Sequence, residues 1–240
     1  MKTLEIKTVF TLTVFGFRIP VTETVIVSWG IMLILITGSL ILTRRLKTVP
    51  SGPQAVLETA VEFLNNFTKN YLGPFSRFLA PYFGSLFLFI FLASIIGMLS
   101  PVEWKIGNRA FTPPFLIRTP IRDINVTAAF ASISILLVLV CGFIARGFLG
   151  WFKHLLYPFP MMLPFNLMDF GTRLISLTLR LFGNILGGFV MMTMLEKVFP
   201  MVLPAICSLY FDFFDGLLQA VIFVFLTTLY ISEAVKTHEE

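Results

Sequence analysis

The sequence predicts an all-α polytopic membrane protein with about three ordinary transmembrane helices, an interfacial amphipathic helix and a C-terminal hairpin of two long, strongly tilted helices. Three observations predict this class. Charged residues make up 13% of the 240 residues, against roughly 25% in a soluble domain. Hydrophobic residues make up 57%, and the mean hydropathy is +0.89. Long uncharged stretches recur along the chain, so we expect one membrane domain over residues 1–240.

The N-terminal segment, residues 1–23, is expected to precede the first membrane span. Its apolar stretch Val9–Phe15 is too short for a cleavable signal peptide, and the charged Arg18 follows where a small-residue cleavage site would stand. Residues 24–43 carry no charge, and a helix of that length rises about 30 Å, enough to cross the hydrocarbon core. The basic residues at 44–47 favour an outside N-terminus and a cytoplasmic C-terminus.

A breaker segment at 50–53 separates this span from an expected interfacial helix at 54–71. Apolar residues recur there at helical spacing among polar ones, which is typical of an amphipathic helix lying on a membrane surface. Two further transmembrane helices are predicted at 81–99 and 126–145, and the loop between them is rich in proline and basic residues.

The last third of the chain predicts two unusually long helices, at 163–199 and 205–236. No proline interrupts residues 165–199 or 205–240, whereas prolines bracket and separate these stretches. Each helix would be about 50 Å long, against a hydrocarbon thickness of about 30 Å. Their apolar composition favours steep tilting over protrusion into water. A hairpin tilted this steeply is unusual, and we expect a partner protein to pack against it.

Two arginines lie in the first of these helices, Arg173 and Arg180, two turns apart and on nearly the same face as Ser176 and Asn184. A charge at the bilayer centre costs about 2.5 to 3.5 kcal/mol on insertion scales, so it persists only where it faces protein or a water-filled cavity. Arg173 could instead snorkel to the interface and serve packing alone. Arg180, in the middle of the apolar run, is the stronger functional candidate.

Small residues follow Arg180 at Gly183, Gly187 and Gly188. This pattern lets another helix backbone approach closely, which is expected at a contact with a partner. Packing within the hairpin would explain any single one of these glycines equally well.

A polar stripe is expected on the second long helix, because Asp212, Asp215 and Gln219 recur at i, i+3 and i+7. Intramembrane carboxylates in a row indicate an aqueous ion path. Alternatively, the two carboxylates form salt bridges to Arg173 and Arg180 that hold the hairpin together, and both roles can coexist.

Several function classes are excluded by motifs that the chain lacks. It has no P-loop, no dinucleotide fingerprint and no zinc-protease motif, so we expect no cofactor, no metal, no direct nucleotide binding and no catalysis by this chain alone. The net charge of +5 is spread through loops without a basic run, which gives no reason to expect nucleic-acid binding.

Two stretches, Ser176–Asn184 (SLTLRLFGN) and Gln219–Phe223 (QAVIF), closely resemble subunit a of the rotary F-type ATP synthase. The similarity covers nearly the whole chain. It includes residues 49–54 (VPSGPQ), residues 123–127 (DINVT) and the long terminal hairpin.

The resemblance implies a stator against which a ring of c subunits turns, with the two long helices wrapped around the ring. The subunit b peripheral stalk and the F1 sector are further implied partners, in a bacterial plasma membrane. Arg180 would be the essential arginine, which attracts the ionised ring carboxylate, helps to force ion release and separates two offset aqueous half-channels. Asn184, Gln219, Ser176 and Arg173 correspond to polar residues near these channels.

Asp123 corresponds to a family acidic residue toward the outer side. Two positions depart from the family pattern: Phe189 stands where many members carry Glu or His, and Asp212 stands where His or Glu is common. Asp215 is an additional carboxylate. We therefore expect Asp212, helped by Asp215, to carry the acid function of the outer half-channel. The choice between H⁺ and Na⁺ is set largely by the ring carboxylate site, which belongs to another chain.

Two other classes of function stay open on the sequence. A self-contained secondary transporter also places charges at the membrane midplane, but such folds usually contain an internal repeat or discontinuous helices, and no repeat is found here. A purely structural membrane subunit would keep transport intact after loss of Arg180.

Overall fold

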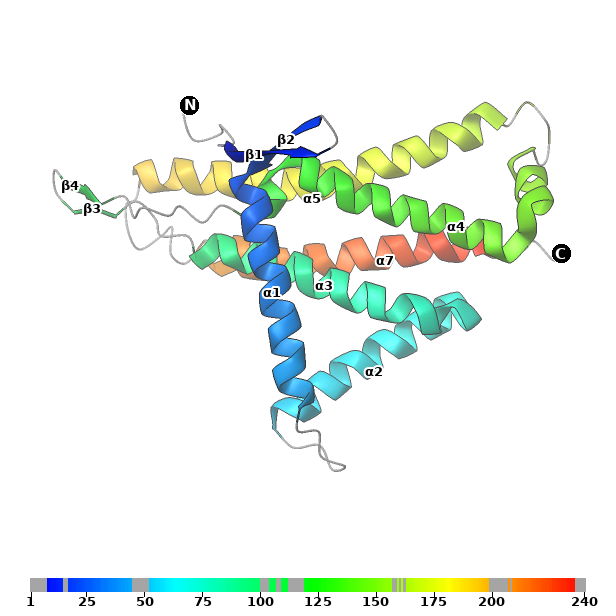
Figure 1. The fold of residues 1–240 in the computed structure, drawn as a ribbon, viewed down its shortest axis with the longest axis horizontal. Coiled ribbons are helices and arrows are strands. Elements are labelled where there is room, and N and C mark those ends of the chain that lie inside the picture. Colours follow the sequence, from blue (N-terminus) through cyan, green and yellow to red (C-terminus); the bar gives the residue numbers. More distant parts are fainter. Residues whose placement is uncertain are drawn as a thin grey trace. The chain divides into compact units, whose positions relative to one another are not determined.

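Helices make up most of the described chain, which confirms the all-helical class (Figure 1). The computed structural model describes residues 8–14, 17–44, 52–99, 104–106, 109–111, 119–156, 159, 161, 163–198, 207 and 209–235. Within these ranges, five segments are long and apolar enough to cross a membrane: Glu23–Thr43, Leu57–Ile96, Ile124–Gly147, Leu163–Leu195 and Asp215–Val235.

The α-helices in chain order are α1 (Glu23–Thr43), α2 (Pro53–Leu72), α3 (Ser76–Leu99), α4 (Ile124–Leu156), α5 (Leu163–Val198) and α7 (Asp215–Val235). The 3-10 turns η2 (Gly73–Phe75) and η3 (Pro120–Arg122) come shortly before α3 and α4. A π-helical segment, η5 (Leu209–Phe214), runs directly into α7.

Two short antiparallel hairpins are present that the sequence analysis does not predict. Strand β1 (Thr8–Val14) pairs with β2 (Phe17–Thr22), and β3 (Trp104–Ile106) pairs with β4 (Arg109–Phe111). In the first hairpin Leu12 lies opposite Ile19. Its strands are rich in Thr, Val and Phe, residue types that fit a pleated surface.

The two long C-terminal helices differ in how much of their predicted length is described. Helix α5 is continuous over 36 residues, which corresponds to about 54 Å. The second helix is described from Leu209 to Val235, as η5 followed by α7. Residue 199 of the first predicted helix and residues 205, 206, 208 and 236 of the second lie outside the described residues.

Helix α4 is kinked at Gly147, which has φ 69° and ψ 167°. Only glycine adopts this backbone conformation without strain. The apolar, membrane-capable part of α4 therefore ends at the kink, one residue after Arg146.

The chain divides into two compact units, each assembled from three stretches. The first unit comprises Met1–Thr43, Leu88–Val126 and Phe182–Gln219, and the second comprises Arg44–Phe87, Thr127–Leu181 and Ala220–Glu240.

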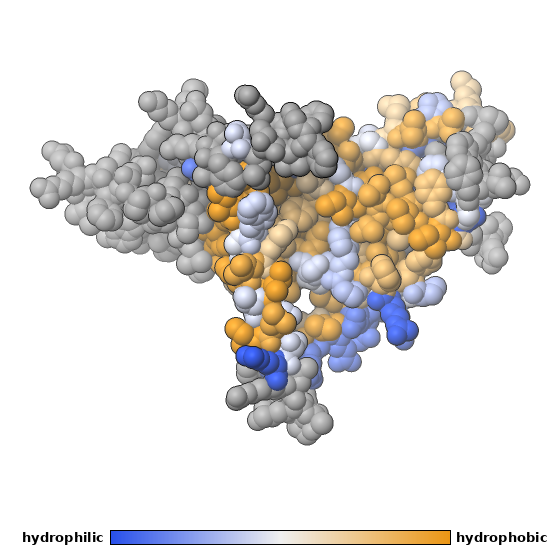
Figure 2. Space-filling view, in the orientation of Figure 1, coloured by the Kyte–Doolittle hydropathy of each residue, from blue (hydrophilic) through white to orange (hydrophobic). Residues whose placement is uncertain are grey.

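In the first unit, the start of α1 packs near η3. Ile31 of α1 and Ile121 of η3 are buried, together with Ile90 and Ala93 of α3. Beyond Ile31 no residue of α1 is buried, and only 6% of the most apolar 18-residue window of the whole helix is buried. Such a surface is stable only against lipid or another subunit. Figure 2 shows apolar side chains over much of the coloured surface on this face of the molecule.

In the second unit, α7 packs against α2. Phe225 of α7 lies 5.9 Å from Phe67 and 6.3 Å from Tyr71, measured between ring centroids. The Ser232 hydroxyl donates a hydrogen bond to the Tyr71 carbonyl at 2.9 Å. Phe223 of α7 is fully buried, at 1% exposure. These contacts fix the C-terminal half of α7. This part of the helix carries Tyr230 and Glu233, which contact Arg173.

Candidate functional site

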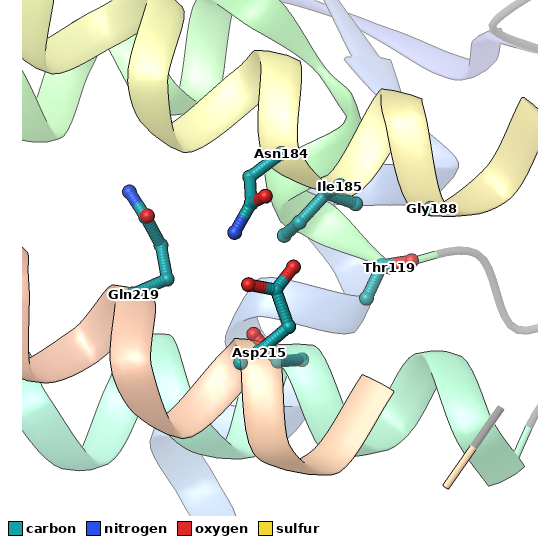
Figure 3. Close-up of a pocket in the computed structure, with 8 residues that line it drawn as sticks. Thr119, Asn184, Ile185, Gly188, Asp215 and Gln219 are labelled. Carbon is teal, nitrogen blue, oxygen red and sulfur yellow. The ribbon is translucent and has the colours of Figure 1, made fainter. Parts of the chain in front are cut away.

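A small polar cavity lies in the first unit, between α5 and the start of α7. Its volume is about 20 Å³, which is room for one water molecule. Figure 3 shows Asn184 extending from α5 while Asp215 and Gln219 extend toward it from α7. Ser94, Thr119, Ile185, Gly188 and Gly216 complete the lining. We call this the Asp215 cavity. Four residues singled out from the sequence, Asn184, Gly188, Asp215 and Gln219, meet here.

Gln219, which lines this cavity, has a buried side-chain donor without a hydrogen-bond partner among the described residues. The residue is 3% exposed, and its Nε2 has no partner within the described chain. A buried donor without a partner costs roughly 1 to 3 kcal/mol.

One wall of the cavity is formed by a close approach of α3 and α7. A Cβ atom placed on Gly216 would overlap the Ser94 side chain and lie 2.9 Å from its Oγ. The Ser94 hydroxyl donates to the Ile90 carbonyl of its own helix at 2.9 Å. Because its hydrogen is used within α3, Ser94 presents only acceptor capacity to the cavity.

Asp212 lies in the π-helical segment η5. The spacing that predicts one stripe assumes 3.6 residues per turn, and a π-helix is wound more widely. The assumption holds for Asp215 and Gln219, one turn apart in α7. It does not extend to Asp212, whose side chain lies outside the described part of the structure.

Arg180 lies on an exposed face of α5. Exposed residues recur there every three or four positions, as Thr172, Ile175, Ser176, Leu179, Arg180, Gly183, Gly187, Val190, Met191 and Met194. We call this set the exposed α5 face. Gly183 and Gly187 have open space where a Cβ would lie. Among the described residues of its own unit, no carboxylate forms an ion pair with Arg180. Arg180 is thus a charged group on a mostly apolar surface.

Arg173 lies in a second polar cluster, within the second unit. It forms ion pairs with Asp169, one turn earlier in α5, and with Glu233 of α7 at 3.0 Å. Its guanidinium also lies 4.7 Å from the centroid of the Tyr230 ring. The sequence suggested Asp212 or Asp215 as the partner of Arg173. The observed partners are instead Asp169 and Glu233, which the sequence patterns did not single out. A cavity of about 100 Å³ adjoins the cluster.

Asp123 is buried and accepts three hydrogen bonds. Its Oδ2 accepts from the Thr24 hydroxyl at 3.0 Å, and its Oδ1 accepts from the Asn125 backbone N–H at 3.0 Å and from Asn125 Nδ2 at 3.1 Å. The residue immediately precedes α4 and has the contacts of an N-cap. It does not line the Asp215 cavity.

Phe189, one of the departures from the family pattern, packs under Arg122. The Arg122 guanidinium carbon lies 3.3 Å from the ring centroid, within the first unit. This is a cation–π contact. A cation therefore lies directly beside this position.

Comparison with known proteins decides the family. The model of the family described as ATP synthase A chain matches residues 25–232. The chain belongs to this family. The ATP synthase subunit a, sodium ion specific, of Propionigenium modestum is 35% identical over 226 residues, which cover 94% of this chain and 78% of the relative. As an ATP synthase A chain it is an integral membrane subunit of the ion-translocating Fo sector, with no catalytic activity of its own.

Proposed function

We propose that the chain is the stator ion-channel subunit of the Fo motor. Two aqueous half-channels would pass H⁺ or Na⁺ to and from carboxylates on a c-subunit ring, with Arg180 separating the channels and driving ion release. Ion flow would thereby be coupled to rotation and ATP synthesis. The observation that carries this proposal is the place of Arg180 on the exposed α5 face.

An arginine facing lipid in the middle of a membrane helix is unfavourable by about 2.5 to 3.5 kcal/mol or more. Ile175 and Leu179 beside it are more than half exposed, at 57% and 53%. A ring surface that brings an ionised carboxylate past this face would remove the penalty, because guanidinium and carboxylate form a strong, bidentate ion pair. Gly183 and Gly187 would let the ring helices approach closely.

The length of α5 supports the same arrangement. At about 54 Å the helix exceeds the hydrocarbon thickness of about 30 Å, so it fits only when strongly tilted or protruding. A tilted helix presents a long oblique face, which suits a curved ring of helices. We place the hairpin of α5 and α7 against that ring, and the amphipathic α2 at the membrane interface.

Two polar sites on α5 supply the half-channels in this proposal. The Asp215 cavity includes Asn184, one turn after Arg180 in the sequence. The cluster around Arg173 includes residues that precede Arg180 in the sequence, and Ser176 comes one turn before Arg180. Its cavity of about 100 Å³ has room for several water molecules. Arg180 would then be the charged barrier between two hydrated regions.

The remaining assignments follow from the family. We place the N-terminus outside and the C-terminus in the cytoplasm of a bacterial plasma membrane, with subunit b and the F1 sector as partners in the complex. The sodium specificity in the name of the Propionigenium modestum relative makes Na⁺ a candidate ion beside H⁺.

The test is ATP synthesis by the purified complex in liposomes after Arg180→Ala. We expect the variant to assemble with the ring, to lose ATP synthesis and to leak ions passively, because the barrier between the half-channels is gone. Arg77→Ala, which removes an exposed arginine on α3, is the matched control and should synthesise ATP normally. Wild-type synthesis by assembled Arg180→Ala would support a purely structural subunit. Ion transport by the chain without any ring would support a secondary transporter.

A further inference from the structure

We propose that Arg122, stacked on Phe189, is a positioning residue that holds the turn η3 against α5 and thereby keeps the Asp215 cavity sealed on the side of Thr119. The inference rests on the proposed stator function, in which each half-channel admits water from one side of the membrane only. It assigns a role to Phe189, a departure from the family pattern that the proposed function leaves unexplained. It also assigns a role to Arg122, which the sequence patterns did not single out.

The first step is the place of Thr119 in the wall of the cavity. Thr119 is 6% exposed and lines the cavity together with Gly188 of α5. Figure 3 shows these two residues at the same side of the cavity. The cavity volume of about 20 Å³ is room for one water molecule. A small displacement of Thr119 would therefore change what can enter the cavity.

The second step is the connection between Thr119 and Arg122. The backbone N–H of Arg122 donates a hydrogen bond to the Thr119 carbonyl at 3.1 Å, which closes the turn η3. The two residues between them, Pro120 and Ile121, are buried, and the proline ring fixes one backbone dihedral of the turn. The turn η3 is therefore a short, stiff unit. A contact that holds Arg122 in place also holds Thr119 in place.

The third step is the contact that holds Arg122. Its guanidinium carbon lies 3.3 Å from the centroid of the Phe189 ring, well within the range of about 6 Å for a cation–π contact. Phe189 directly follows Gly188, so the contact is made next to the cavity wall. The guanidinium stays charged at every physiological pH, so the contact does not depend on pH. The hydrogen bond from Thr24 to Asp123, the residue that caps η3, ties the turn to α1. Two contacts thus hold η3 to two different helices.

The experiment measures how fast a water-soluble thiol reagent reaches Thr119 in the complete complex. The parent complex carries Thr119→Cys, with the two native cysteines removed by Cys141→Ala and Cys207→Ala. Thr119→Cys keeps the backbone hydrogen bond of η3, because that bond uses only the carbonyl of the residue. A charged methanethiosulfonate reagent should label the parent complex slowly, since the position is 6% exposed in the closed arrangement.

Variants of the clamp are then compared with this parent complex. Arg122→Gln and Phe189→Leu each remove the cation–π contact, so labelling should become roughly threefold to thirtyfold faster, the factor by which such a contact shifts an equilibrium between a closed and an open turn. Because both substitutions remove the same contact, the double variant should label no faster than either single variant. Arg122→Lys keeps a cation over the ring and should label nearly as slowly as the parent. Phe78→Leu, which removes a ring that is 90% exposed on α3, is the matched control.

Unchanged labelling in both Arg122→Gln and Phe189→Leu would overturn the proposal, and so would fast labelling that persists in Arg122→Lys. A second measurement needs no variant: a high-resolution map of the wild-type complex should show the Arg122 guanidinium on the Phe189 ring and no ordered water between Thr119 and Gly188. A water-filled opening between these two residues would contradict the seal. Neither readout uses ATP synthesis, so a failure of the seal is distinguishable from a failure of the stator function, which Arg180→Ala tests separately.

Discussion

Asp123 gives the sharpest test of a structural role against a role in ion transport. Replacing it by alanine removes the N-cap of α4, worth about 1 kcal/mol. It also removes the acceptor of the buried Thr24 hydroxyl, and a hydrogen bond to a charged group is worth about 1.5 to 3 kcal/mol. We therefore expect Asp123→Ala to lose about 2.5 to 4 kcal/mol of stability. Asp123→Asn retains an oxygen for the cap, so it should lose only the second part.

The assay heats the purified complex in detergent and uses the release of this subunit as the signal for its unfolding. ATP synthesis per assembled complex is measured in parallel. Thr24→Val removes the same hydrogen bond from the other side. Asp123→Asn should therefore add little further destabilisation in the Thr24→Val background. We expect Asp123→Asn and Thr24→Val to retain the wild-type rate of ATP synthesis per assembled complex. Unchanged stability together with lost synthesis would refute this reasoning and return Asp123 to the ion path that the family resemblance implies.

Three further substitutions test the packing with the same thermal assay. Gly216→Ala should destabilise by about 1 to 3 kcal/mol because the new Cβ overlaps Ser94. Gly38→Ala, inside α1, meets open space and should stabilise by about 0.5 to 1 kcal/mol through the higher helix propensity of alanine; equal stability of the two variants would contradict the close approach. Gly147→Ala forces a positive φ on alanine and should cost about 1 to 3 kcal/mol, and no loss would mean that the kink is not required. Glu233→Gln removes an ion pair whose carboxylate side chain is 65% exposed, so the loss should stay below about 1 kcal/mol; a larger loss would show that the pair is shielded from water in the complex.

The membrane-capable helices can be predicted from the sequence because their signal is local. Length, absence of charge and flanking breakers specify them without knowledge of any contact. The first of these helices illustrates this: the uncharged run 24–43 lies within α1, Glu23–Thr43. The hairpins β1–β2 and β3–β4 carry a weaker signal, since each strand is short and is stabilised by pairing with another segment.

The candidate site is predictable only where one helix carries it. Asp215 and Gln219 are one turn apart, so their shared face follows from helical geometry. Ser94 and Thr119 come from distant segments, and no local pattern connects them with Asp215. Glu233 is an intermediate case: it follows Gln219 by about four helical turns and continues the same face, so periodicity alone could have suggested it.

The π-helical segment η5 shows why the expectation for Asp212 differs from the observed backbone. Its residues, LYFDFF, are apolar and aromatic around the single acid, and nothing in that composition distinguishes a π-helix from an α-helix. Phe91 of α3 packs on Phe213 with ring centroids 5.7 Å apart. The π-helical segment thus packs against a residue that is distant in the sequence, and no local sequence pattern encodes such a contact.

The exposed α5 face also bears on how the complex is built. Until a ring covers it, Arg180 would face acyl chains or draw water and lipid headgroups inward, which thins the bilayer locally. A newly inserted copy would therefore be unstable in the membrane without the ring. We expect it to be degraded faster in cells that lack the c subunit, and its lifetime there, measured after synthesis is stopped, should lengthen with Arg180→Leu. The same charge that works in the finished motor would thus favour an order of assembly in which the ring forms first.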